Sequence, residues 1–214
     1  MRFPPPRRPR ERGAALMVIL TIILMAGASM AIEALLIKSK RNREDQKAGF
    51  ALMEAKRTLI AYARTTGVNR LPCPNLTPTV DYGSSAEADS SCANGTTSLG
   101  FLPWTTLGLP PLVDGTNSPI WYAVVPATAY ASCSLQINGQ GSFAAILFAP
   151  GDPLVTQNRA LTTSMTVVQQ QYLESLPDLT LAHPHNFLAP VAGSGTANDR
   201  LSGITCQEML AAIN

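Results

Sequence analysis

The clearest hydropathy pattern in this sequence is an uncharged, almost wholly apolar run over residues 13–32, bounded by Arg12 and Glu33. A run of about 20 apolar residues is long enough to cross the hydrocarbon core of a bilayer as a helix. Before it lies a short leader that contains five arginines and four prolines. The pattern therefore predicts one membrane-spanning helix close to the N-terminus.

The helical pattern continues beyond this apolar run. Residues 14–64 contain no proline, and their only glycines are Gly27 and Gly49. Apolar residues then recur at spacings of four and three along one helix face. They are Ala48, Leu52, Ala55, Leu59 and Tyr62. We predict a single helix of about 50 residues, on the order of 75 Å long at 1.5 Å per residue, with an apolar first half and an amphipathic second half.

The distal region shows shorter alternating and apolar runs separated by turn residues, a pattern typical of strands. The predicted strands are residues 120–125, 132–137, 142–148 and 201–205, the predicted helices are residues 163–175 and 207–213, and residues 75–98 are expected to form a loop. A turn at Gly139–Gly141 should join the second and third strands. Strands joined by tight turns pair antiparallel. The predicted fold class is α+β, a long N-terminal helix packed on a small antiparallel sheet.

Charge is distributed unevenly along the chain. Residues 1–64 carry 13 basic and 5 acidic residues, whereas residues 65–214 carry 3 basic and 9 acidic ones. A distal region this acidic lacks the basic face that nucleic-acid binding needs. The basic residues instead flank the apolar run, where anionic lipid headgroups would lie.

Cys73, Cys92, Cys133 and Cys206 are the four cysteines, and none belongs to a Cys-x-x-Cys pair. An even number in an exported chain indicates two disulfides rather than a zinc or redox site. Of the three connectivities, we favour Cys73–Cys92, which closes a local loop, together with Cys133–Cys206. Four free thiols are the alternative.

Three interpretations of the N-terminus compete. A secretory signal could be cleaved after Ala28 or Ala31, because small residues stand at the required positions before each bond. A plain membrane anchor is the second, although basic residues on both sides leave its orientation open. The third is a type IV prepilin leader cut after Gly13, which leaves Ala14 as the new N-terminus. The continuous helix favours this third interpretation, because a cleaved signal would not require it.

Residues 10–37 resemble the N-terminus of type IV pilins and of type II secretion pseudopilins, and most closely their minor subunits. The usual motif places an aromatic residue after the glycine and a glutamate at the fifth mature position. Here these positions hold Ala14 and Val18. In the family that glutamate pairs with the N-terminal amine of a neighbouring subunit, and the pseudopilus tip subunit lacks it. The departure therefore favours a tip or priming subunit over a major fibre subunit.

Distal motifs resemble a group of prepilin-like proteins of Gram-negative bacteria. The segments that carry this resemblance are Leu71-Pro72-Cys73-Pro74, Phe101-Leu102-Pro103-Trp104, Leu107-Gly108-Leu109-Pro110 and Asn198-Asp199-Arg200-Leu201. The resemblance implies a leader at 1–13, a transmembrane half-helix at 14–37, a periplasmic half-helix at 38–65 and a globular domain at 66–214. It also implies cleavage by prepilin peptidase between Gly13 and Ala14, and N-methylation of Ala14. The side chains implied in filament packing are Leu16, Val18, Leu20, Ile23 and Leu24.

No catalytic constellation stands out in the sequence: there is no nucleophile elbow, phosphate-binding glycine loop or dinucleotide fingerprint. His183 and His185 flank Pro184 without an evident third ligand, so a surface loop is the favoured interpretation over a metal site. Asp114 and Asn117 offer oxygen ligands, and a calcium site there is the alternative to an ordinary Asx turn. We therefore expect no enzyme activity, no cofactor other than this calcium alternative, and no small-molecule substrate.

These observations predict a single-pass protein of the bacterial inner membrane, with a cytoplasmic N-terminus and a periplasmic globular domain. The expected function is that of a minor pilin or pseudopilin, a tip or priming subunit of a type IV pilus or type II secretion filament. Its expected partners are other pilins, which it contacts through the N-terminal helix, and prepilin peptidase. The alternative is a periplasmic or secreted binding protein released after Ala28 or Ala31.

Overall fold

A computed structural model of the chain describes residues 12–65, 70–77, 88, 97–125, 133–160, 164–174, 176, 185–189 and 198–213, without the side chains of residues 12–16, 29 and 31. The chain divides into two compact units, Met1–Arg43 and Glu44–Asn214. Helix α1 (Arg12–Thr65) is 54 residues long and contributes residues to both units. The predicted long helix is therefore confirmed, and its end at Thr65 falls one residue beyond the predicted stretch.

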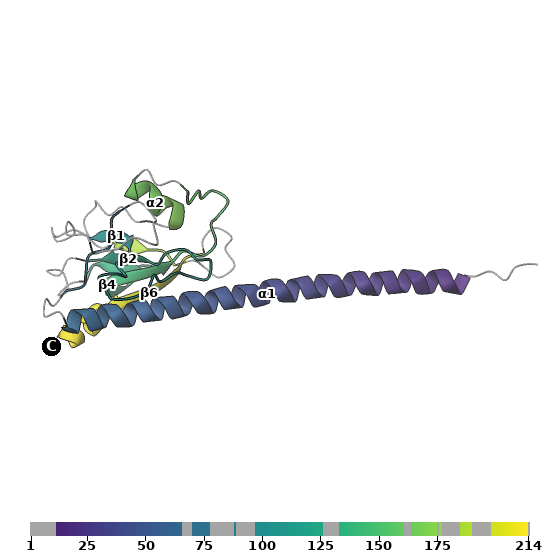
Figure 1. Cartoon of the computed structure of the whole chain (residues 1–214), viewed down its shortest axis with the longest axis horizontal. Coiled ribbons are helices and arrows are strands. Elements are labelled where there is room, and N and C mark those ends of the chain that lie inside the picture. The colour runs from purple at the N-terminus through teal and green to yellow at the C-terminus, as the bar shows by residue number, and fades with distance from the viewer. Residues whose placement is uncertain are drawn as a thin grey trace, which may run out of the picture. The chain divides into compact units, whose positions relative to one another are not determined.

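The second unit is built around one long strand, β4 (Gln140–Ala149). Antiparallel partners of β4 are β2 (Trp121–Val124), β3 (Leu135–Ile137) and β6 (Arg200–Thr205). β1 (Ser98–Phe101) pairs antiparallel with β2, and β5 (His185–Phe187) pairs in parallel with β3. Among the described strands, β1, β5 and β6 each have a single partner strand. The described sheet thus runs β1-β2-β4-β3-β5, with β6 also paired to β4. Strands β1, β2, β4 and β6 are labelled in Figure 1.

The predicted α+β class, a long N-terminal helix with a small, mainly antiparallel sheet, is confirmed, whereas several details of the sheet differ from the prediction. Strands β1 and β5 were not predicted, and the parallel pairing of β3 with β5 makes the sheet mixed rather than purely antiparallel. The turn before β4 consists of Asn138 and Gly139, both with positive φ, rather than Gly139–Gly141. An Asn-Gly pair with two positive φ values matches the right-handed twist of the strands it joins, which explains why the turn lies there.

The C-terminal half of α1 packs on the sheet through a face of mostly small side chains. The buried residues on this face are Ala48, Ala51, Leu52, Ala55, Leu59 and Ala63. Four of the five apolar residues predicted to line one helix face are among them, whereas the fifth, Tyr62, is only half-buried. This face of the helix therefore forms part of the hydrophobic core of the second unit.

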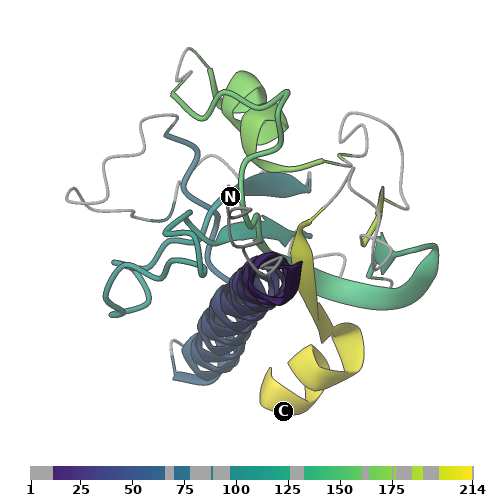
Figure 2. The same cartoon turned by 90° about the vertical axis from the view of Figure 1, so that its right-hand side faces the viewer.

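The two short helices lie on opposite sides of the sheet. Helix α2 (Met165–Tyr172) lies across the sheet from α1, whereas α3 (Cys206–Ile213) lies beside the last turns of α1 (Figure 1; Figure 2). Ser164 caps α2 by accepting a hydrogen bond from the backbone N–H of Val167 at 3.3 Å. Both helices confirm sequence predictions to within a few residues.

One of the two predicted disulfides is present among the described residues. Cys133, just before β3, is bonded to Cys206 at the start of α3, with their Cα atoms 5.9 Å apart. Cys73 is also disulfide-bonded, and its predicted partner Cys92 lies outside the described residues. The confirmed bridge ties the sheet to the C-terminal helix.

The Cys133–Cys206 bridge should contribute strongly to the stability of the second unit, because it closes a loop across a sequence separation of 73 residues. Replacing both residues by alanine should lower the free energy of unfolding by roughly 2–5 kcal/mol. Denaturant unfolding of the detergent-solubilised full chain measures this change, with wild type under reducing conditions as a parallel sample. An unchanged free energy of unfolding would show that the bridge does not restrain the unfolded chain.

Candidate functional site

The N-terminal half of α1 is apolar and exposed around its whole circumference. Of the predicted packing side chains, Val18, Leu20, Ile23 and Leu24 are 49–64% exposed, and that of Leu16 lies outside the described side chains. Successive helix residues are turned by about 100° from one another. These four residues therefore point in different directions, and no single side of the segment is polar.

This segment carries few polar groups that would oppose its transfer out of water. The hydroxyl of Thr21 donates a hydrogen bond to the backbone carbonyl of Val18 at 2.9 Å, so its donor is satisfied within the helix. The first charged residue after Arg12 is Glu33, which is exposed. Gly13 and Ala14, the predicted cleavage pair, fall in the first turn of α1, and the leader residues 1–11 lie outside the described residues.

By length and composition, α1 is the one helix in the described part of the chain that could cross a membrane. A secretory signal near an N-terminus has the same properties. The length and composition of α1 thus support a membrane-inserting segment.

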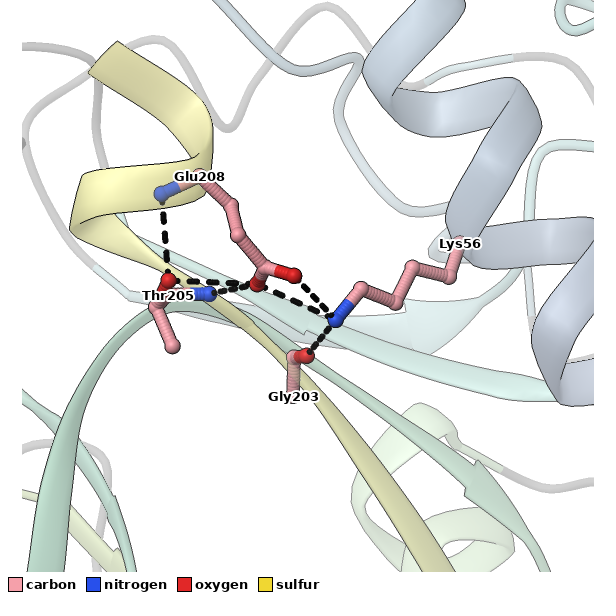
Figure 3. Close-up of polar contacts among 4 residues, drawn as sticks. All are labelled: Lys56, Gly203, Thr205 and Glu208. Carbon is pink, nitrogen blue, oxygen red and sulfur yellow. Dashed lines mark hydrogen bonds and ion pairs between the residues drawn. The ribbon is translucent and has the colours of Figure 1, made fainter. Parts of the chain in front are cut away.

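A second notable site joins α1 to the C-terminal end of the chain (Figure 3). The ammonium of Lys56 donates hydrogen bonds to the carbonyl of Gly203 in β6 at 2.8 Å and to a carboxylate oxygen of Glu208 in α3 at 3.0 Å. The second carboxylate oxygen of Glu208 lies 2.8 Å from the same nitrogen. One lysine therefore contacts the last strand and the last helix together.

Glu208 also belongs to a reciprocal cap at the start of α3. Its carboxylate accepts a hydrogen bond from the backbone N–H of Thr205 at 2.8 Å, and its own N–H donates to the Thr205 hydroxyl at 3.1 Å. This arrangement is a capping box, in which two otherwise unpaired backbone donors are satisfied. The pattern Thr-x-x-Glu is visible in the sequence at residues 205–208, although this cap was not among the sequence predictions.

The charge state of Glu208 follows from these contacts. Partial burial alone would raise the pKa of Glu208, but hydrogen bonds from Lys56 and Thr205 together lower this pKa below its ordinary value. Glu208 is therefore ionised at neutral pH, and the ion pair with Lys56 is present there.

Asp114 and Asn117, the calcium alternative, have oxygens that already accept hydrogen bonds from the protein. Oδ1 of Asp114 accepts from the N–H and hydroxyl of Thr116 and from the N–H of Ser118, and Oδ2 accepts from the N–H of Gly151, all at 2.8 Å. Oδ1 of Asn117 accepts from Lys47 at 3.0 Å. The hydrogen bonds of these two side chains hold their loop in place, and this arrangement favours the Asx turn over cation binding.

Two further sequence expectations can be compared with the structure. His185 was expected to lie in a surface loop. It is instead buried as the first residue of β5, where its backbone N–H donates to the backbone carbonyl of Ser134 at 2.8 Å. His183 lies outside the described residues. In the part of the chain that is described, no three His, Cys, Asp or Glu side chains are grouped so that they could hold a metal ion.

Comparisons with known proteins do not identify a relative. No protein-family model, no curated protein and no solved structure matches this chain.

The Lys56–Glu208 pair gives a prediction about the C-terminal cap. Glu208→Gln keeps an acceptor for Thr205 but removes the ion pair, and because both side chains are partly exposed, the loss should be only roughly 0.2–1 kcal/mol. Thr205→Val removes the cap itself and should cost about 1 kcal/mol. Thermal unfolding of the full chain in detergent measures both.

The pH dependence distinguishes the two variants. Because the pKa of Glu208 is lowered in the folded state, its contribution is complete above its ordinary pKa and is lost as the pH falls through the lowered value. The difference between wild type and Glu208→Gln should therefore disappear in acid, whereas most of the Thr205→Val deficit should persist. Equal losses at all pH values for both variants would contradict this account of the cap.

Proposed function

We propose that this chain is a non-enzymatic minor pilin or pseudopilin, a tip or priming subunit of a type IV pilus or type II secretion filament. Prepilin peptidase would cut it after Gly13, and Ala14 would become the N-methylated terminus. The globular unit would lie in the periplasm, and residues 14–37 would first sit in the inner membrane and then pack against other pilins.

The observation that carries this proposal is the continuity of α1. One helix extends from Arg12 to Thr65; its first half exposes apolar side chains on every side, and its second half is buried against the sheet through Ala55, Leu59 and Ala63. A helix of this kind can leave the bilayer only by exchanging lipid for other apolar surfaces, and the helices of sister subunits provide them.

Val18 is the feature that favours a tip or priming role over a fibre role. A carboxylate at the centre of a membrane helix costs about 2.5–3.5 kcal/mol on insertion scales unless it is paired. A subunit that never docks beneath another one gains nothing from that carboxylate. An apolar Val18 at the fifth mature position is consistent with a subunit used at one end of a filament.

The alternative is a periplasmic or secreted binding protein, released by signal peptidase after Ala28 or Ala31. Its support is that a signal sequence would share the length and composition of this apolar segment. Cleavage there would divide α1 and remove Val18, Leu20, Ile23 and Leu24 from the mature chain. The two functions therefore predict mature proteins with different N-termini.

Substitutions at the two sets of cleavage sites should separate these functions. In a host that has a prepilin peptidase, Gly13→Trp should abolish the start at Ala14, because the peptidase requires a small residue before the scissile bond. Intact-mass measurement of the membrane-extracted protein reads out the cleavage site and the added methyl group.

The matched control is the double variant Ala28→Trp/Ala31→Trp, which places bulky residues at both signal-peptidase sites. It should still begin at Ala14. A wild-type protein that begins at Ser29 or Ile32, and is stopped by the double variant but not by Gly13→Trp, would refute the filament proposal and support the secreted one.

In-vivo crosslinking tests the proposed partners. A photoreactive residue in place of Leu20 or Leu24 should yield adducts with other chains that carry an apolar pilin-type N-terminal helix, identified by mass spectrometry. The control position is Val155, which is fully exposed in the second unit. Adducts from Val155 alone, or only lipid adducts from Leu20 and Leu24, would contradict helix-mediated assembly.

A further inference from the structure

Two acidic residues meet in the interior of the second unit, where the end of α2 approaches the start of β6. Glu174 lies two residues beyond the end of α2, and Asp199 precedes β6 and is only 5% exposed. The backbone N–H of Glu174 donates to Oδ2 of Asp199, and the N–H of Asp199 donates to Oε2 of Glu174, each at 3.2 Å. This reciprocal pair of bonds, hereafter the carboxyl clasp, joins two segments 25 residues apart.

The donors around the clasp show which carboxyl holds a proton. Glu174 accepts three hydrogen bonds, from the N–H groups of Asn198 and Asp199 and from the side-chain amide of Gln157. Asp199 accepts one, and its other oxygen, Oδ1, is buried without a hydrogen-bond partner among the described residues. A buried carboxylate oxygen without a donor is costly. The proton therefore belongs on Asp199, whose side chain also forms a hydrogen bond with the Glu174 side chain.

The electrostatics agree with this assignment. Burial raises the pKa of Asp199, the neighbouring charge of Glu174 raises it further, and the pKa reaches about 9 although a backbone hydrogen bond and the charge of Arg159 oppose the rise. Sharing one proton between two close carboxyls is the usual result when both cannot ionise together.

The surrounding charges do not neutralise an ionised Asp199. Arg159 donates to the carbonyl of Gly151 at 2.8 Å and to the Ser118 hydroxyl, and its guanidinium carbon lies 4.7 Å from the centre of the Tyr172 ring. These nearest partners of Arg159 are all neutral groups.

The other charged groups near Asp199 interact with other partners or with solvent. Arg200 pairs with Asp45 at 2.7 Å, Asp114 is saturated by backbone and hydroxyl donors, and Asp152 is exposed.

The clasp holds α2 in a position that covers part of the sheet. Tyr172 contacts the rings of Phe101 and Trp121, with centroids 6.4 Å and 5.5 Å away. The side-chain amide of Gln169 donates to the carbonyl of Leu99 at 2.7 Å. Because β1 is an edge strand, this last bond occupies a backbone acceptor that would otherwise be available to another strand.

We propose that the carboxyl clasp is a proton-dependent latch, which keeps α2 over the edge of β1 while Asp199 is protonated and releases it when Asp199 loses its proton to solvent. Two adjacent buried carboxylates then repel each other, and the bond between the Asp199 and Glu174 side chains is lost. The released form exposes the aromatic rings of Phe101 and Trp121 and the backbone carbonyl of Leu99, whereas the backbone of Phe101 stays paired with Asn75. This latch does not depend on the filament proposal.

The sign of the pH dependence follows from the raised pKa of Asp199 in the closed form. We call the form with the clasp formed the closed form and the released form the open form. At pH values between the ordinary aspartate pKa and about 9, the closed form binds one proton more than the open form. The closed form is therefore most favoured in acid, and its advantage falls as the pH rises, until it levels off above the closed-state pKa.

Hydrogen exchange of the full chain in detergent tests the latch. After correction for the intrinsic rate, the protection of amides in α2 should fall by about tenfold per pH unit from about pH 6 to about pH 8 and level off near pH 9. Amides of β4 should keep their protection throughout, because the opening is local. Constant protection of α2, or loss of protection in β4 at the same pH, would overturn the proposal.

Variants assign the effect to Asp199. Asp199→Asn retains an acceptor for Glu174 and a donor to its carboxylate, so the protection of α2 should become independent of pH. Asp152→Asn removes an exposed acid from the neighbouring loop and should behave as wild type. A pH-dependent opening that survives in Asp199→Asn, or disappears in Asp152→Asn, would refute the assignment.

Glu174→Gln provides a second test if Asp199→Asn does not fold. Without the neighbouring negative charge, the pKa of Asp199 should fall, and the pH at which protection levels off should fall with it, by about one unit or more. The infrared carbonyl band of a protonated carboxyl should accompany the closed form in wild type. A levelling pH that does not move in Glu174→Gln would contradict the coupling of the two residues.

Discussion

The second unit depends on the burial of one face of α1 in its hydrophobic core. On that face Ala48, Ala55 and Ala63 are buried, and the buried side chains of Leu52 and Leu59 each contribute about 1.5–3 kcal/mol of hydrophobic stabilisation. Larger residues at the buried alanine positions would overpack this core. Lys56 lies on the same helix, and its contacts with Gly203 and Glu208 join the helix to β6 and α3.

The C-terminal end of the chain is fixed by contacts of three different kinds. β6 pairs with β4 alone among the described strands, and Lys56 and Glu208 engage the Gly203 carbonyl and the Thr205 N–H. Edge strands that leave such groups unpaired invite association with other chains. The disulfide at Cys206 adds a covalent restraint where the strand becomes a helix. Together these contacts close the sheet against α1 and satisfy part of its edge.

The sequence predicted those elements that have a local signature. The periods of 3.6 and 2 identified α1, α2, β2 and β4, because each buries one face or a continuous apolar run. Strands β1 and β5 have three or four residues and are strands only by virtue of distant partners, so no local period reveals them. The pairing of Asp199 with Glu174 is equally non-local. The capping box of Thr205 and Glu208 was readable, because its spacing alone defines it.

Two buried acids of this unit show why burial alone does not define a site. Asp114 is completely buried, and four hydrogen bonds from three residues engage both of its oxygens, so it holds its loop together. Asp199 is almost equally buried but has a single donor. The same side chain is therefore fully hydrogen-bonded at one position and a proton-binding group at the other. The number of donors, which depends on how separate loops meet, decides between these roles.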